Sequence, residues 1–250
     1  MLPYQFYQVK RFPKLTSGQQ VKTRVQLTFS GEGEDVDTSF TMENPKFEGS
    51  IGYVRVKSQI KHNTVGYIKT LVDHERRKLE FYEYLQPVDF PAFYDASRNV
   101  VMFKAPKKVC RGVLANIHSN ECGVALQEME VDFEKVLDIC SEYLGAWFRG
   151  VSTRVHSAGL SGDQIQDDPL FKKLLKHGDL SNITVPWQFE SAEHRVMLTR
   201  HGAIVLVQDY KDNQGIELAI VGDVFDRLLN RVWAARRARG GDDPEVAPDP

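Results

Sequence analysis

Four cations surround a predicted helix start, and of all the residue clusters in this sequence they point most directly to one chemistry, the binding of an anion. Lys104, Lys107, Lys108 and Arg111 flank Pro106, and proline suits the first helical position because no N–H is needed there. A helix start carries partial positive charge and unpaired N–H groups, so cations there repel the helix dipole. A bound anion would relieve that repulsion. We therefore predict an anion site, with phosphate as the natural ligand; lysines that simply point into water are the alternative.

A second set of cations lies in segments that alternate polar and apolar residues. Arg55 and Lys57 share one face with Tyr53, and Lys61 and Lys69 follow along the chain. Basic and aromatic residues on an open sheet face have the chemistry of a surface that holds phosphates and stacks bases. The sequence has no RNA-recognition motif to support this reading. A solvated outer face is therefore the alternative.

The patterns that would indicate catalysis are weak. The sequence contains no glycine-rich phosphate loop, no GxSxG, no HExxH and no CxxC motif. Glu128, Glu130 and Asp132 would share one strand face and could hold a divalent metal, but no lysine accompanies them on that strand. His156 with Asp163 is a second weak candidate. We expect no catalytic site, no metal and no cofactor, with a metal-dependent nuclease or phosphoesterase as the alternative.

The cysteines and the apolar runs indicate a cellular compartment. Cys110, Cys122 and Cys140 are odd in number and widely spaced, which fits reduced thiols better than disulfides. Cys110, His118 and Cys122 lack the compact spacing of a zinc site, so Cys110 is predicted to be a core residue. No signal segment and no membrane-spanning apolar run is present in the sequence. We expect a soluble cytoplasmic protein with no membrane partner.

Strands in the first half would position the basic residues. Alternation in residues 24–29 and 53–57 is typical of half-buried antiparallel strands. A helix is predicted from Pro106 through Ile117, and residues 30–35 have the composition of a loop. The predicted strands cover residues 5–10, 23–29, 51–59, 66–71, 79–85 and 100–104.

The second half mixes helices and strands. Asp168, Pro169 and Gly178 have the residue types of an N-cap, a first helical position and a helix end. An amphipathic helix is predicted over residues 223–239, with arginines that include Arg227 on its outer face. The other predictions are a helix over 133–144, a loop over 157–162, and strands over 124–131, 147–156, 195–198, 203–209 and 217–221.

The two halves also differ in charge. Residues 1–125 contain 18 Lys and Arg against 13 Asp and Glu, a net charge of +5, and residues 126–250 contain 14 against 21, a net charge of −7. The fold class is predicted to be α+β, with a strand-rich N-terminal half built on an antiparallel sheet. The mixed C-terminal half has a hairpin and a terminal amphipathic helix. The predicted domains are residues 1–122 and 123–239, followed by a disordered tail over 240–250.

These features favour a non-enzymatic binding protein or an accessory subunit of a larger complex. The basic half would contact nucleic acid or another polyanion, and the acidic half would contact a protein partner. A protein-interaction or inhibitor module, for which a bacterial antiviral system is one setting, is a further alternative. The sequence does not indicate a small-molecule ligand.

Overall fold

Strands dominate the computed structural model, which describes residues 2–29, 32–72, 75–118, 123–210 and 213–233. The side chains of residues 25–29, 32–34, 68–72, 75–77, 79 and 118 lie outside this description. The described residues form twelve strands and four α-helices, and the strand registers are antiparallel. The predicted strand-rich α+β class is confirmed. No helix in the described ranges is both long and apolar enough to cross a membrane.

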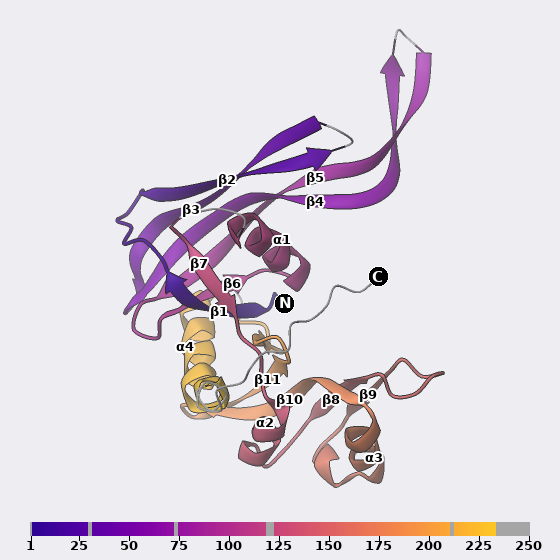
Figure 1. The fold of residues 1–250 in the computed structure, drawn as a ribbon. Coiled ribbons are helices and arrows are strands. Elements are labelled where there is room, and N and C mark those ends of the chain that lie inside the picture. Colours follow the sequence, from indigo (N-terminus) through magenta and orange to yellow (C-terminus); the bar gives the residue numbers. More distant parts are fainter. Residues whose placement is uncertain (1, 30–31, 73–74, 119–122, 211–212, 234–250) are drawn as a thin grey trace. The chain divides into compact units, whose positions relative to one another are not determined.

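The chain divides into two compact units, Leu2–Gln127 and Glu128–Pro250. In the first unit the strands lie in the order β2-β3-β4-β5-β6-β1, with β7 beside β1 and helix α1 on one face (Figure 1). Its elements are β1 (Tyr4–Arg11), β2 (Gln20–Phe29), β3 (Glu32–Glu48), β4 (Ile51–Val72), β5 (Glu75–Asp95), β6 (Val100–Lys104), α1 (Lys107–His118) and β7 (Ala125–Glu128).

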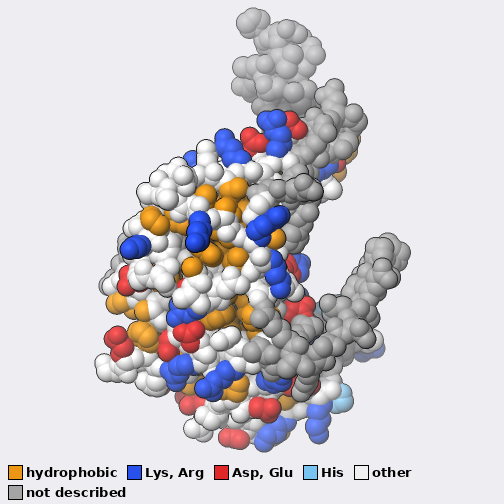
Figure 2. All heavy atoms as spheres, turned by 60° about the vertical axis from the view of Figure 1, so that its left-hand side comes forward, with side chains coloured by type: hydrophobic (Ala, Val, Ile, Leu, Met, Phe, Trp, Pro, Cys, Tyr) orange, Lys and Arg blue, Asp and Glu red, His pale blue; other side chains and the backbone are white. Residues whose placement is uncertain are grey.

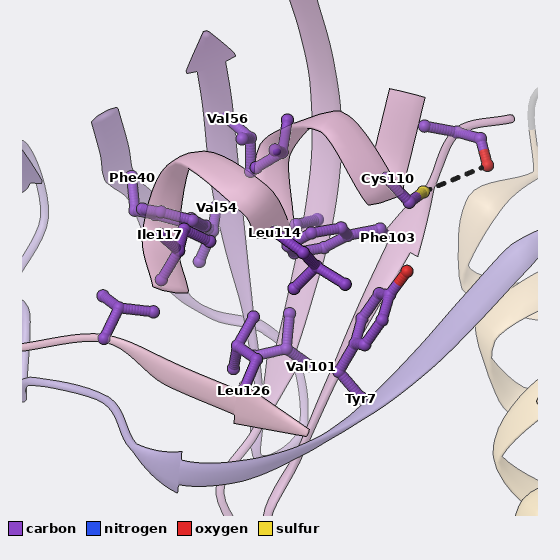
Figure 3. Packing of buried hydrophobic residues seen from close by; sticks show 14 of the residues in the cluster. Tyr7, Phe40, Val54, Val56, Val101, Phe103, Cys110, Leu114, Ile117 and Leu126 are labelled. Carbon is purple, nitrogen blue, oxygen red and sulfur yellow. Dashed lines mark hydrogen bonds between the residues drawn. The ribbon is translucent and has the colours of Figure 1, made fainter. Parts of the chain in front are cut away.

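The core of the first unit lies between α1 and the sheet. Phe103 from β6 and Val56 from β4 are fully buried and face the apolar side of α1, where Leu114 and Ile117 lie (Figure 3). Cys110 is buried among them, and its thiol donates to the carbonyl of Ala105 at 3.5 Å. The predicted core role of this cysteine agrees with its position.

Polar contacts fix the direction of α1 along β4. The Asn116 side chain donates to the Ser58 hydroxyl at 3.1 Å and to the Gln59 carbonyl at 2.9 Å. One turn earlier, a side chain at Gly112 would collide with Ile60. Helix α1 therefore runs antiparallel to β4. Its first turn lies towards the part of β4 that follows Ile60.

Strands β4 and β5 form a hairpin much longer than predicted. The strands predicted over residues 51–59 and 66–71 are parts of one strand, which continues through a bulge between Asn63 and Gly66. In the described residues, β4 beyond Lys57 and β5 before Ala92 pair only with each other. This two-stranded arm projects from the sheet (Figure 1). The bulge accommodates the extra residue of β4 without ending its pairing with β5.

The prediction of a loop over residues 30–35 is wrong for residues 32–35. Residues 32–35 belong to β3 and pair with residues 26–29 of β2, and residues 30–31 lie outside the described part of the chain. Glycine and acidic residues indicated a loop, but the cross-strand ladder holds them in extended conformation.

The second unit contains a sheet in the order β12-β11-β10-β8-β9. Helix α3 starts as predicted, because the Leu170 N–H donates to the Asp168 carboxylate at 2.7 Å and Pro169 occupies the first turn. The elements are α2 (Phe133–Ile139), β8 (Gly145–Arg149), β9 (Ser157–Ser161), η1 (Ile165–Asp167), α3 (Pro169–His177), β10 (Asp179–Phe189), β11 (Ala192–Thr199), β12 (Ala203–Leu206), α4 (Gln214–Val224) and the π-helical η2 (Phe225–Leu229).

Several predictions for this unit are wrong. Residues 217–221 were predicted as a strand but are helical. The Asn213 side chain accepts the Ile216 N–H at 3.2 Å and caps the start of α4. The prediction failed because a short apolar run fits a buried strand or a buried helix equally well. The helix predicted to start at residue 223 therefore starts earlier. Residues 157–161 form β9 rather than a loop, while the strand predicted over 147–156 ends at Arg149.

Candidate nucleic-acid interface

The start of α1 carries the predicted cations. Lys107 and Lys108 lie in its first turn, which contains no acidic residue, and Arg111 follows one turn later. Lys108 and Arg111 are exposed, whereas Lys107 is half-buried. The Cys110 N–H donates to the Pro106 carbonyl at 3.1 Å, so the helical hydrogen bonding begins where the sequence predicted it.

Lys104 does not join these three cations. Phe103 faces α1, and successive side chains of a strand point to opposite faces, so Lys104 lies on the other face of the sheet. Its ammonium lies 5.1 Å from the ring centroid of Tyr4, its cross-strand neighbour. The four predicted residues are therefore divided between two faces, and only the helix cations form one group.

The outer face of β4 has cations that are already paired. The Arg55 guanidinium forms a two-bond ion pair with Asp89, in which Nη2 lies 3.0 Å from Oδ2. This hydrogen bond raises the pKa of Arg55 and lowers the pKa of Asp89. Lys57 lies beside Asp89 in a shallow hollow of about 620 Å³. Asp35 and Asp37 line the same hollow.

Arg24 completes this arrangement from β2, with ion pairs at 3.2 Å to Asp35 and Asp37. Three cations therefore face three carboxylates around the hollow: Arg24, Arg55 and Lys57 against Asp35, Asp37 and Asp89. On the face drawn in Figure 2, Lys and Arg side chains are mixed with apolar, polar and acidic ones. The outer strand face thus offers a phosphate little net positive charge.

The two remaining predicted strand cations lie on the arm. Lys61 forms an ion pair with Glu83 at 3.0 Å. The backbone of Lys69 pairs with that of Lys78, but the Lys69 side chain lies outside the described residues. Lys61 therefore adds no unpaired cation to the described outer face.

The arm instead presents aromatic residues that were not among the predicted site residues. Tyr67, Tyr82 and Tyr84 expose 56, 62 and 39% of their surface. The cross-strand pairs of His62 with Tyr84 and of Tyr67 with Glu80 place these side chains on one face of the ribbon, since cross-strand neighbours share a face and β5 alternates. This is also the face of β4 that α1 covers nearer the sheet.

We call the five residues His62, Tyr67, Lys78, Tyr82 and Tyr84 the arm surface. The rings of His62 and Tyr84 are stacked, with centroids 4.8 Å apart and planes 10° from parallel. The Lys78 ammonium lies 4.2 Å from the Tyr67 ring centroid. The His62 Nε2 atom is buried and has no hydrogen-bond partner among the described residues. The alternating tyrosines in residues 79–85 were the sequence signal that could have found this surface.

The candidate metal ligands Glu128, Glu130 and Asp132 belong to no metal-binding group in the described part of the chain. The described residues contain no group of three or more His, Cys, Asp or Glu side chains placed to hold a metal ion. Glu128 and Glu130 are exposed, and Asp132 precedes α2. Burial raises the pKa of Cys140 to about 11, so its thiol stays protonated and is a poor nucleophile at neutral pH. His118 and Cys122, the discounted zinc residues, lie outside the description of side chains.

Arg227, on the terminal helix, is held within its own unit. Its guanidinium lies 4.7 Å from the Trp187 ring centroid and donates to the Gln188 carbonyl at 3.1 Å and to Asp223 at 3.0 Å. The Trp187 indole also donates to Asp223 at 2.8 Å. The arginines beyond residue 233 and the predicted tail over 240–250 lie outside the described residues.

No model of a protein family matches the chain, and no curated protein matches it either. The chemistry available is therefore that of the side chains themselves. The arm surface can stack planar rings, and the start of α1 can attract anions.

Proposed function

We propose that this chain is a non-enzymatic, cytoplasmic binding protein that holds single-stranded nucleic acid on the arm surface. The observation that carries the proposal is the exposure of Tyr67, Tyr82 and Tyr84 on one face of a two-stranded ribbon. Exposed rings in such a row contribute little to folding, and clustered exposed apolar surface marks interaction sites. Unstacked bases offer the planar faces that such rings bind, largely irrespective of sequence.

The start of α1 supports the proposal by supplying charge on the same side of the ribbon. Its first turn is directed towards the distal part of β4, where the arm begins. Lys108 and Arg111 are exposed there, and the helix N–H groups add partial positive charge. A strand whose bases lie on the tyrosines would therefore carry its phosphates towards these cations.

Single strands are favoured over duplexes because of the kind of contact available. Duplex binding without base stacking depends on cations that neutralise the backbone, and the cations of the outer β4 face are paired with carboxylates. Stacking on a tyrosine needs a base that is free of its neighbours. The arm surface offers the second kind of contact.

Fluorescence anisotropy with labelled single- and double-stranded DNA and RNA tests the proposal. We expect single strands to bind more tightly than duplexes of the same sequence, with an affinity that falls as salt rises. Equal or tighter binding to duplexes would contradict stacking as the main contact. Absence of binding at low salt would overturn the proposal and leave the arm surface as a protein-docking face.

An accessory role in a complex is the second candidate function, and an observation in the other unit favours it. Leu170 and Leu175 on α3 expose 50 and 40% of their surface in the acidic unit. Exposed leucines on a short helix are suited to contact with a protein. A nuclease-treated pull-down that loses a stable partner when both leucines become serine would support this role. Identical recovery by the variant and the wild type would contradict it.

A further inference from the structure

Strand β9 forms one edge of the sheet in the second unit. It pairs with β8 on one side, from Gly145 opposite Ser161 to Arg149 opposite Ser157, and no described strand pairs with its other side. The Gly150 N–H donates to the His156 carbonyl at 2.9 Å, immediately beyond this ladder. The other end of the ladder is closed in the same way, by the Gly162 N–H donating to the Leu144 carbonyl at 3.1 Å.

These two bonds show which backbone groups of β9 face outward. Hydrogen-bonded and non-bonded pairs alternate along an antiparallel ladder. Since the pairs at residues 156 and 162 are bonded, those at Ser157, Gly159 and Ser161 are not. These three residues therefore turn their N–H and C=O groups away from β8, and all three are exposed.

The edge lacks the features that usually prevent pairing with another chain. Charged side chains and prolines commonly protect edge strands. The edge strand of the first unit, β2, carries Lys22 and Arg24 among its described side chains. Strand β9 has the sequence Ser-Ala-Gly-Leu-Ser, with neither a charge nor a proline. It is therefore an open template for strand addition.

An exposed tryptophan lies directly beside this edge. Trp147 of β8 is the cross-strand neighbour of Gly159, and 45% of its surface is exposed. A side-chain carbon at Gly159 would lie 2.4 Å from the indole, so the ring covers the glycine. The absence of a side chain at position 159 brings the indole towards the free edge, where it can contact whatever pairs with β9.

We propose that β9 pairs antiparallel with β9 of a second copy of this chain, about a two-fold axis at Gly159. Ser157 of each copy then lies opposite Ser161 of the other, and the two Gly159 residues lie opposite one another. The outward backbone groups of these residues pair, and the two Trp147 rings approach over the glycine pair. Such an interface uses the same surface on both copies, as two-fold symmetry requires.

Charge complementarity identifies a second copy as the occupant and the antiparallel direction as its orientation. Arg154 precedes β9, Asp163 follows it, and both are exposed. Antiparallel pairing about Gly159 brings the basic end of one strand beside the acidic end of the other at both ends of the interface. Parallel pairing would place like charges together, which is unfavourable. The segment is thus complementary to itself in one orientation.

Sedimentation equilibrium of the full chain tests this pairing, with two matched variants. The wild type should show a concentration-dependent dimer. Ser157→Lys with Ser161→Lys places lysines opposite lysines in the dimer and should raise its Kd at least tenfold. Ser157→Glu with Ser161→Lys places opposite charges together and should restore dimerisation to near the wild-type Kd. Both serines are exposed, so thermal unfolding of the monomer should be similar in both variants.

Three outcomes would overturn the proposal. One is a wild type that remains monomeric at the highest concentration reached, which would leave the edge to another protein or to solvent. The second is a dimer that both variants retain equally, which would place the interface elsewhere. The third is a dimer that the two variants weaken equally, because pairing about Gly159 requires the charge-reversed variant to recover.

Discussion

The arm and the body of the first sheet place the same kinds of residue in opposite environments. In the body, the aromatic rings of Tyr53 and Phe93 lie 5.6 Å apart and Phe93 is fully buried. On the arm, Tyr67 and Tyr82 expose more than half of their surface. Phe93 packs against the rings of Tyr4 and Phe47 as well, and the body strands are flanked by further strands, whereas the arm has two strands only. Exposure, rather than residue type, therefore separates the rings that stabilise the fold from those available to a ligand.

Cations follow the same division. Arg55 on the body is fixed by a carboxylate on the neighbouring strand, whereas Lys108 at the helix start is exposed and has no acid in the same turn. A basic residue in the sequence thus indicates a phosphate contact only where no carboxylate has been placed opposite it.

Removing the tyrosine rings of the arm should have the largest effect, a loss of affinity for single-stranded nucleic acid. Tyr67→Ala with Tyr82→Ala should weaken single-strand binding by at least tenfold, because each stacked base contributes about 1–3 kcal/mol. The measurement is a Kd by fluorescence anisotropy at one fixed salt concentration. Stability should change little, since both side chains are exposed.

The matched control, Tyr67→Phe with Tyr82→Phe, keeps the rings and should bind like the wild type. Loss of binding in the phenylalanine variant would show that the hydroxyl groups, not the rings, make the contact.

A change in the body should act on stability instead. The buried Asp95 carboxylate accepts N–H bonds from Ser97 at 2.9 Å and Arg98 at 3.2 Å and pairs with the Arg98 guanidinium. Asp95→Ala should lower the free energy of unfolding by about 1–3 kcal/mol, because these donors lose their acceptor. Urea denaturation measures the loss. The folded variant should bind nucleic acid like the wild type, and a specific loss of binding would show that the body takes part in the contact.

The same carboxylate predicts a pH dependence. Burial alone would raise the pKa of Asp95, but the bonds from Ser97 and Arg98 outweigh it and hold the pKa below its ordinary value. Its contribution is therefore complete above the unfolded pKa of about 3.9 and is lost as pH falls through the lower, folded value. The stability difference between the wild type and Asp95→Asn should shrink below about pH 4. A constant difference down to pH 2 would contradict this assignment.

The helix cations should have a smaller effect, visible in salt dependence. Lys107→Ala with Lys108→Ala should reduce the slope of log Kd against log salt by up to about 1.4, since each phosphate contact on a single strand contributes about 0.7. Anisotropy titrations at several salt concentrations measure the slope. Lys57→Ala, beside Asp89 on the outer face, is the matched control and should leave the slope unchanged. Equal slopes in all three proteins would remove the helix start from the interface.

The smallest effect is expected at the paired arginine. Arg55→Ala breaks an ion pair whose side chains are about 40% exposed. The free energy of unfolding should fall by no more than about 1 kcal/mol, and single-strand binding should not change. Thermal unfolding and anisotropy measure the two quantities. A large loss of binding would mean that Arg55 exchanges Asp89 for a phosphate, and would make the body and the arm one surface.

Several local features could be predicted from the sequence because short-range chemistry decides them. The turn-like residues 95–99 predicted where β6 begins, and the cap at Asp168 with Pro169 predicted the start of α3. Pro106 predicted the start of α1, together with the cations in its first turn. In each case the deciding contacts lie within a few residues, so the residue types alone carry the information.

The tertiary structure decided everything that depends on distant partners. Arg55 and Asp89 are 34 residues apart, and only the register of β4 against β5 brings them together and neutralises the predicted basic face. The apolar run at 217–221, predicted as a strand, is a buried helix, and a short apolar run alone does not distinguish a buried strand from a buried helix. The tyrosines of the arm lie on the face that α1 covers nearer the sheet, and they are exposed where that cover has ended. Residue types set the possible contacts, and strand pairing determined which of them are satisfied within the chain and which remain available to a ligand.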